Sequence, residues 1–157
     1  MYYILEYCPG GELFFYLQQI GRFKESAVKF YAANILLAFN HLHLKGVLYR
    51  DLKPENVLVD GDGYLKITDF GLSSIVGEEQ PQNSITGTAE YIAPEQLQGV
   101  SSTKASDWWS FGIIVYEMLT GLPPFMHKKR EKLYQKIKYC EPNVEYPYLS
   151  AEAKDLL

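Results

Sequence analysis

The sequence predicts a mainly α-helical domain that contains one small β-hairpin. Apolar residues recur at helical spacing over residues 25–45, and residues 107–119 are apolar nearly all round. Two short β-like runs, at 57–59 and 64–67, are joined by Asp-Gly-Asp-Gly, which is typical of a hairpin connection. The 157 residues suffice for one domain with its own hydrophobic core.

The elements before the hairpin follow from turn residues and periodicity. Residues 2–7 predict a strand, which ends at the turn residues 8–11. Residues 12–19 predict a short helix that is broken at Gly21. The long helix over residues 25–45 carries Val28, Ile35 and Phe39 at helical spacing, and Gly46 supplies its C-terminal stop.

The elements after the hairpin are helices separated by irregular chain. Residues 69–95 have little periodicity, and so long a stretch inside a compact domain is usually functional. The helix over 107–119 belongs in the middle of the core because it has no polar face. A helix over 129–138 is polar on one side, and Ser150 is the expected N-cap of a last helix. Because the chain begins inside a predicted strand and ends inside a predicted helix, we expect a partial domain.

Composition excludes several classes of protein. Hydrophobic residues are 47%, charged residues are 22% and the net charge is −4, which argues against disorder and against a nucleic-acid partner. Two cysteines are too few for a disulfide framework, so we expect a cytoplasmic location, with the nucleus left open. The longest apolar stretch is too short to span a bilayer, which argues against direct membrane insertion.

The candidate chemistry lies at the two ends of the hairpin. Residues 49–56, Tyr-Arg-Asp-Leu-Lys-Pro-Glu-Asn, precede its first strand, and Asp-Phe-Gly at 69–71 follows its second. The hairpin therefore brings Asp51, Lys53, Asn56 and Asp69 close together. Two acids, an amide and an ammonium at loop ends suit a phosphate that is bound through Mg²⁺, since this ion prefers oxygen ligands.

These motifs resemble the AGC group of Ser/Thr protein kinases. The catalytic loop of that group carries Tyr where other kinases have His, as Tyr49 does here, and Ala-Pro-Glu at 93–95 matches a further kinase motif. The resemblance covers residues 1–157. It implies a protein-kinase-like C-terminal lobe with the hinge, in which the N-terminal lobe and the C-terminal end of the domain are absent. With the N-terminal lobe included, the class would be α+β.

The resemblance implies a role for each candidate residue. Asp51, Lys53, Asn56 and Thr88 would be catalytic, and Asn56 and Asp69 would hold Mg²⁺. The cofactor would be ATP with Mg²⁺. The residues implied to contact the nucleotide are Leu5, Glu6, Tyr7, Cys8, Leu58 and Thr68.

The resemblance also implies substrates and regulation. Glu12, Glu55 and Glu117 match positions that bind arginines upstream of the phospho-acceptor, so the expected partners are protein substrates with basic residues before a Ser or Thr. Ser84 is the implied regulatory phosphosite, modified by an upstream activating kinase and paired with Arg50, and Thr86 is the second choice.

Other interpretations stay open beside these. The alternative function is a catalytically inactive kinase fragment or pseudokinase that acts as a binding module, and the intact catalytic residues favour the enzyme. The chain alone is expected to be inactive, because it contains no Gly-rich phosphate loop. The basic run at 127–130 most simply predicts a solvated helix start. Asp107 is expected to be structural and to accept backbone hydrogen bonds from the catalytic loop.

Overall fold

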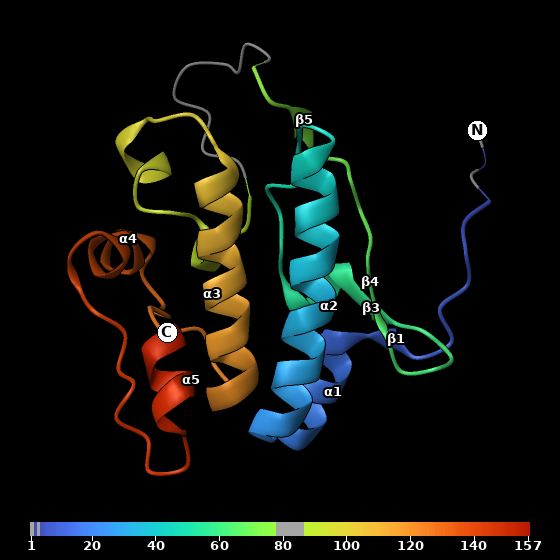
Figure 1. Ribbon diagram of the computed structural model, residues 1–157. Coiled ribbons are helices and arrows are strands. Elements are labelled where there is room, and N and C mark those ends of the chain that lie inside the picture. The colour runs from blue at the N-terminus through green and yellow to red at the C-terminus, as the bar shows by residue number, and fades with distance from the viewer. Residues whose placement is uncertain (1, 3, 78–86) are drawn as a thin grey trace.

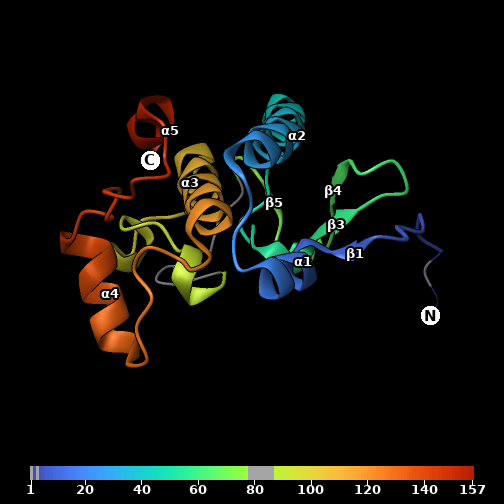
Figure 2. The ribbon, with the colours of Figure 1, turned by 90° about the horizontal axis from the view of Figure 1, so that it is seen from below.

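Two long antiparallel helices form the centre of the molecule. The computed structural model describes residues 2, 4–77 and 87–157. Helix α2 (Glu25–Leu44) and helix α3 (Lys104–Thr120) lie side by side and run in opposite directions (Figure 1). Helix α1 (Leu13–Ile20) lies near the start of α2, and α4 (Arg130–Tyr139) and α5 (Ala151–Leu156) lie on the other side of α3 (Figure 2). The mainly helical prediction is confirmed for the described residues.

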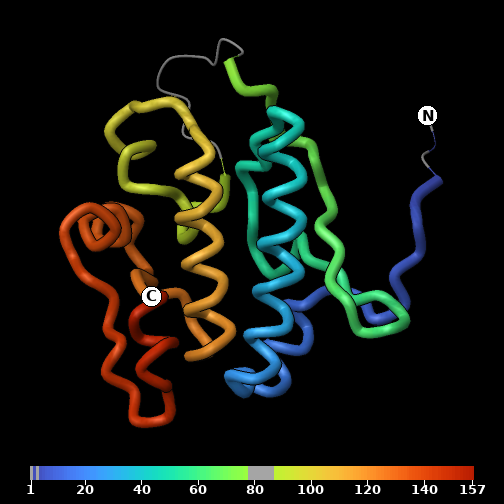
Figure 3. Tube along the Cα trace, in the orientation of Figure 1, coloured from blue at the N-terminus to red at the C-terminus, as the bar shows by residue number. Residues whose placement is uncertain are grey.

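The strands are short and stand beside α2. Strands β3 (Val57–Val59) and β4 (Leu65–Ile67) form the predicted hairpin, which is visible as a loop beside α2 in Figure 3. Strand β1 (Gly11–Glu12) pairs antiparallel with β3 and extends the hairpin to three strands. A second pair, β2 (Val47–Leu48) with β5 (Ser74–Ile75), holds the chain after the hairpin against the end of α2. Short 3₁₀ turns η1 (Pro54–Asn56), η2 (Ala89–Tyr91) and η3 (Gln96–Gln98) complete the connections.

Helix α3 is the most buried of the described α-helices, as its composition predicts. Phe111, Ile114 and Met118 are among its buried side chains. The helix starts at Lys104 rather than at residue 107, because Thr103 caps it: the Thr103 hydroxyl oxygen accepts from the amide of Ala105 at 3.2 Å. Polar caps lie outside an apolar pattern, so periodicity alone places the start too late.

The core fastens the loop at residues 49–56 to the helices. Tyr49 is 0% exposed and Leu52 is 1% exposed, and both pack in the main cluster with Phe39 and Met118. A second cluster joins η2 and α3 to α4 through Tyr91, Ile113, Phe125, Leu133 and Ile137. The loop that carries the candidate chemistry is therefore anchored by buried side chains.

The predicted strand over residues 2–7 is wrong. Its described residues, 2 and 4–7, form no strand, and the segment runs away from the helices (Figure 1). An extended run becomes a strand only when a neighbour accepts its hydrogen bonds, and the bond that joins this part of the chain to β3 comes at Gly10, whose amide donates to the Val59 carbonyl at 3.0 Å. Among the described residues, no helix has both the length and the apolar character needed to cross a bilayer.

Candidate active site

Asp107 holds the predicted catalytic loop, residues 49–56, through hydrogen bonds from its backbone amides. Its side chain is 1% exposed, and its Oδ1 accepts from the Arg50 amide at 2.8 Å. Its Oδ2 accepts from the Tyr49 amide at 3.0 Å and lies 2.8 Å from Nε2 of His43. The predicted backbone hydrogen bonds are thus confirmed. They hold Arg50 at a φ of 71°, a left-handed conformation that a non-glycine residue adopts only under such constraint.

Four predicted catalytic side chains, those of Asp51, Lys53, Asn56 and Thr88, lie in contact next to this part of the loop. Nζ of Lys53 lies 3.1 Å from Oδ2 of Asp51 and donates to the Thr88 hydroxyl at 3.1 Å. That hydroxyl donates to Oδ1 of Asp51 at 3.0 Å. Asn56 donates through Nδ2 to Oδ2 of Asp51 at 3.0 Å and to the Asp51 carbonyl at 2.9 Å. Both carboxylate oxygens of Asp51 are therefore oriented by hydrogen bonds.

Asp69 is brought to the same place by the hairpin rather than by a bond to Asp51. The β3–β4 ladder ends with the Thr68 amide donating to the Asn56 carbonyl at 3.0 Å, so Asp69 follows directly after the partner of Asn56. Asp69 is exposed, has a φ of 57°, and accepts from the Gly71 amide at 3.1 Å. The side chain that the sequence predicts as a metal ligand is therefore solvent-accessible.

Only some of the residues that are predicted to contact the nucleotide lie beside the predicted catalytic loop. Leu58 lies in β3 opposite Glu12, and the Thr68 carbonyl accepts from the Tyr49 hydroxyl, so both stand beside the catalytic loop. Glu6 pairs with Lys66 of β4. The other contacts predicted before β1, Leu5, Tyr7 and Cys8, are exposed or half-buried.

Two of the three predicted substrate acids line one cavity of about 400 Å³. Glu55 and Glu117 face this space together with Glu90 and Thr88, whereas Glu12, in β1, is not among its lining residues. One side-chain oxygen of Glu55, Oε2, is buried there without a hydrogen-bond partner. Because Thr88 also contacts Asp51, this acidic cavity adjoins the cluster formed by Asp51, Lys53, Asn56 and Thr88.

Glu117 is the most perturbed of these acids. It is 6% exposed and accepts a hydrogen bond from the Tyr91 hydroxyl. Burial raises the pKa of Glu117 to about 7; the Tyr91 hydrogen bond works against this rise, and the nearby Glu55 and Glu90 carboxylates add to it. Burial also raises the pKa of Tyr91, so the phenol stays a hydrogen-bond donor.

The predicted phosphosite residues Ser84 and Thr86 lie outside the described residues. Arg50, the predicted partner of Ser84, donates from Nε to the Leu72 carbonyl. Gly87, the first described residue after this segment, has a φ of 109° and packs so closely that a Cβ there would lie 2.8 Å from the Arg50 carbonyl. This contact sets Thr88 against the catalytic loop.

Sequence reasoning missed three contributors to the site: His43, Glu90 and Tyr91. His43 lies one turn after Phe39 on the buried side of α2, and a histidine on an apolar face is a detectable signal. The Tyr91–Glu117 contact joins residues 26 positions apart and has no local signature.

Comparison with known proteins agrees with this geometry. The family model described as "Protein kinase domain" matches residues 1–157. The chain is 50% identical over 157 residues to "Protein kinase 2" of Dictyostelium discoideum and covers all of itself and 33% of that protein. It is 47% identical over 160 residues to the "RAC family serine/threonine-protein kinase homolog" of the same organism, covering 36% of it.

A third relative is "Serine/threonine-protein kinase YPK1" of Saccharomyces cerevisiae, which is 46% identical over 158 residues, and the chain covers 23% of it. The chain thus spans about a third or less of the length of these curated relatives. Together, the catalytic loop, the full-length family match and relatives of the AGC type show that the chain belongs to the protein kinase family and resembles its AGC-type Ser/Thr members.

Proposed function

We propose that the protein containing this chain transfers the γ-phosphoryl group of ATP to Ser and Thr hydroxyls of protein substrates. One observation carries the proposal: Lys53, Asn56 and Thr88 all contact the side chain of Asp51. Phosphoryl transfer depends on positioning and on charge stabilisation rather than on covalent chemistry by the protein, and this cluster supplies both.

The chain's own residues divide the work. Asp51 accepts the proton of the substrate hydroxyl, and its carboxylate is pre-oriented by Asn56 and Thr88. Lys53 is 23% exposed, so its ammonium is within reach of a phosphoryl group in the open site. The Asp107 brace keeps the loop in place while the side chains act.

The donor set fits Mg²⁺. Asn56 uses its amide nitrogen on Asp51, which leaves its carbonyl oxygen as the available ligand atom, and Asp69 offers an exposed carboxylate. These are hard oxygen donors, as this ion prefers. Within the described ranges no group of three or more His, Cys, Asp or Glu gathers for a metal, which agrees with an ion held partly by phosphate oxygens. When bound, Mg²⁺ neutralises charge on the phosphates.

We assign this chain to the hinge and the mainly helical C-terminal lobe of a kinase domain. The two central helices and the hairpin that carries the catalytic loop support the assignment. Residues 5–8, Leu58 and Thr68 would then contact the adenine ring when ATP is bound. The remaining nucleotide contacts come from outside this chain, because a Gly-rich phosphate loop is not among its 157 residues.

The acidic cavity supports a preference for substrates with arginine upstream of the acceptor. Glu55 has a buried oxygen without a partner, and Glu117 is buried beside it, so an entering guanidinium meets carboxylates that lack a counter-charge. Hydrogen bonds from arginine to a carboxylate are charge-assisted and directional. Glu12 lies in β1, outside the lining of this cavity.

Regulation follows from the same loop. An upstream kinase phosphorylates Ser84, and the phosphate pairs with Arg50, next to the catalytic Asp51. We also propose that the protein containing this chain acts in the cytoplasm, where cysteines stay reduced. The free cysteines Cys8 and Cys140 support this location.

The test is a phosphotransfer assay on the full-length protein. With Mg·ATP and an Arg-Arg-x-Ser peptide, Asp51→Asn should lower turnover by at least about a hundredfold, because the proton acceptor is lost. The matched control is Asp62→Asn in the exposed hairpin turn, which should retain wild-type turnover. Full activity of Asp51→Asn would refute the assigned role. Peptide binding without any phosphate transfer by the wild type would identify a binding module instead.

A further inference from the structure

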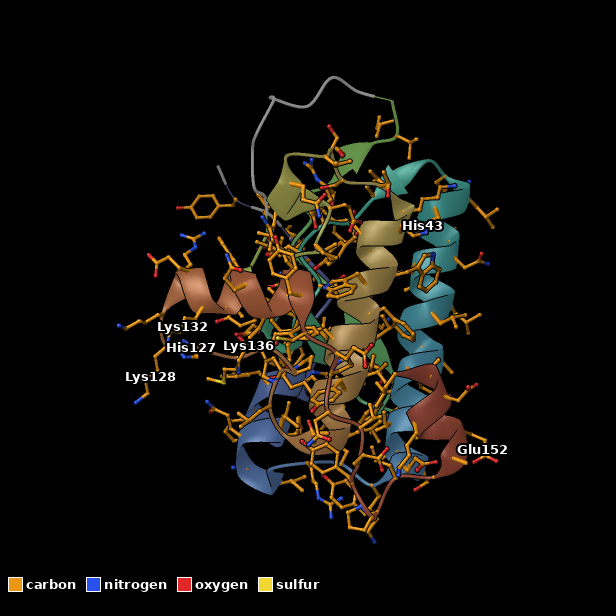
Figure 4. The ribbon with its side chains drawn as sticks, turned by 90° about the vertical axis from the view of Figure 1, so that its left-hand side faces the viewer. His43, His127, Lys128, Lys132, Lys136 and Glu152 are labelled. Atoms are coloured by element: carbon orange, nitrogen blue, oxygen red, sulfur yellow. The ribbon has the colours of Figure 1, made fainter. Side chains whose placement is uncertain are left out.

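Helix α4 and the residues before it carry a dense positive charge on an acidic chain. Residues 127–138 contain six of the chain's 15 Lys and Arg, together with His127, and only one acid, Glu131, whereas the net charge of the chain is −4. Figure 4 shows His127, Lys128, Lys132 and Lys136 gathered along α4, with Glu152 far from them on α5. We call Lys128, Lys132 and Lys136 the α4 basic face; His127 belongs to the start of the helix, because its Nδ1 accepts from the Lys129 amide at 2.9 Å.

Among the described residues, the fold uses this face only at Lys136, whose ammonium donates to the Met126 carbonyl. None of the ion pairs between described residues involves residues 127–138. Arg130 donates to the hydroxyl of Tyr134 rather than to a carboxylate. Lys128 and Lys132 are exposed.

Helix stability explains Lys136, which lies in the last turn of α4 where the dipole favours a cation, but it does not explain the cations at the start of the helix. Lys128, Lys129 and Arg130 precede or open α4, where the positive end of the helix dipole disfavours further positive charge. Lys129 is the N-cap residue, and its side chain makes no capping hydrogen bond. The helix is held instead by Leu133 and Ile137, which are buried against the second core cluster. The cations at the start of α4 therefore lie on a helix that buried side chains hold in place, although their charge opposes the helix dipole.

The face begins at the rim of the acidic cavity. Leu122, Pro123 and Met126 line that cavity, and the chain continues directly from Met126 to His127. Nζ of Lys136 donates to the Met126 carbonyl at 3.3 Å, which ties the middle of α4 to the rim. A negative cavity and a positive helix face therefore adjoin each other on one surface.

We infer that the α4 basic face docks an acidic segment of the protein substrate whose basic residues occupy the adjoining cavity. This inference rests on the proposed function, and it deepens it by naming a bipartite substrate class. Paired patches of opposite sign favour one orientation of a partner and disfavour the reverse, since reversal sets like charges against each other. An acidic segment also gains from the positive end of the α4 dipole.

Binding and catalysis are measured separately. The full-length protein is titrated with three fluorescein-labelled peptides: an Arg-Arg-x-Ser peptide, an acidic Asp/Glu-rich peptide, and one peptide joining both. The joined peptide should bind tightest, and its affinity should fall as salt is raised. Changing Lys128, Lys132 and Lys136 together to Gln should weaken the joined peptide roughly tenfold and leave the basic peptide unchanged, because each exposed pair contributes modestly.

The matched control removes equal charge elsewhere. Lys24, Lys45 and Lys104 are exposed at helix ends on α2 and α3, and the triple Gln variant of these residues should bind all three peptides as the wild type does. Equal weakening by both triple variants would overturn the docking face. Tighter binding of phosphatidylserine vesicles or of single-stranded RNA than of the joined peptide would also overturn it, in favour of a membrane or a nucleic acid.

The two proposals fail in different ways. If the protein binds the acidic peptide through α4 yet phosphorylates no peptide, the docking face stands and the proposed activity falls. If phosphorylation of the basic peptide is normal and neither triple variant alters binding of the joined peptide, the activity stands and the docking face falls. Melting temperatures of both triple variants, expected to equal that of the wild type, exclude unfolding as the cause.

Discussion

Replacing Glu117 by Gln should change how the stability of the protein depends on pH. The carboxyl group is 6% exposed and its pKa is raised from 4.5 to about 7, mainly by burial. A raised pKa means that the folded state prefers the protonated group. The stabilisation is therefore fully present below about pH 4.5, and it is lost as pH rises through about 7.

The size of the effect follows from the same two values. Each pKa unit corresponds to about 1.4 kcal/mol, so ionising Glu117 in the folded protein lowers the free energy of unfolding by about 3 kcal/mol. Gln has almost the same shape and can still accept the hydrogen bond from Tyr91, but it does not ionise. The variant should match the wild type near pH 4 and exceed it by up to about 3 kcal/mol near pH 8.

The assay is urea unfolding, followed by the fluorescence of Trp108 and Trp109, at both pH values. The control is Glu152→Gln on α5, whose side chain is exposed, and its difference from wild type should not vary with pH. A Glu117→Gln variant with the same stability difference at both pH values would contradict the argument. A wild type more stable than this variant near pH 8 would contradict it as well.

Two further substitutions test the frame of the site. Asp107→Asn keeps only one acceptor oxygen for the bonds that Asp107 now accepts, so it should lower the free energy of unfolding in urea by about 1–3 kcal/mol and impair turnover. Asp62→Asn is the control and should change neither. Unaltered stability of Asp107→Asn would show that these hydrogen bonds are dispensable. Gly121→Ala should lower the melting temperature, because φ is 95° and a Cβ would clash with the Gly21 carbonyl. Gly112→Ala is the control: its Cβ would meet nothing within 4 Å, so it should raise the melting temperature by stabilising α3 by up to about 1 kcal/mol. Equal shifts for the two variants would refute the assigned contact.

Much of the fold could be predicted because a helix that packs on a core needs apolar residues at helical spacing, and this pattern is local in the sequence. The apolar spacing in residues 25–45 requires a buried stripe, and α2 ends within one residue of that range. Strand pairing obeys no such rule. The run at residues 2–7 has strand composition but no partner, whereas Gly11 and Glu12, which lack strand composition, form β1 because β3 offers them hydrogen bonds.

In the candidate site, too, the contacts between residues close in sequence could be predicted from the local pattern, and those between distant residues could not. Asp51, Lys53 and Asn56 lie within six consecutive residues, so one turn of chain suffices to predict that they meet. Thr88 joins them from 37 residues away, and the sequence predicts this only through the family resemblance. The bond from Tyr91 to Glu117 and the unpaired oxygen of Glu55 depend on how η2, η1 and α3 pack, which no local pattern encodes.

The acidic cavity links the expected pH dependence of stability to the proposed binding of basic substrates. A fold selected for stability alone would not bury Glu117 beside Glu55 and Glu90, because burial and like charge both oppose its ionisation. An arginine that enters the cavity reverses both effects, since it supplies the missing positive charge and a donor for the unpaired Glu55 oxygen. Binding of a basic substrate should therefore release a proton near neutral pH and recover the stability that the empty, ionised cavity lacks. The carboxylates that weaken the free protein are the ones a basic substrate would satisfy.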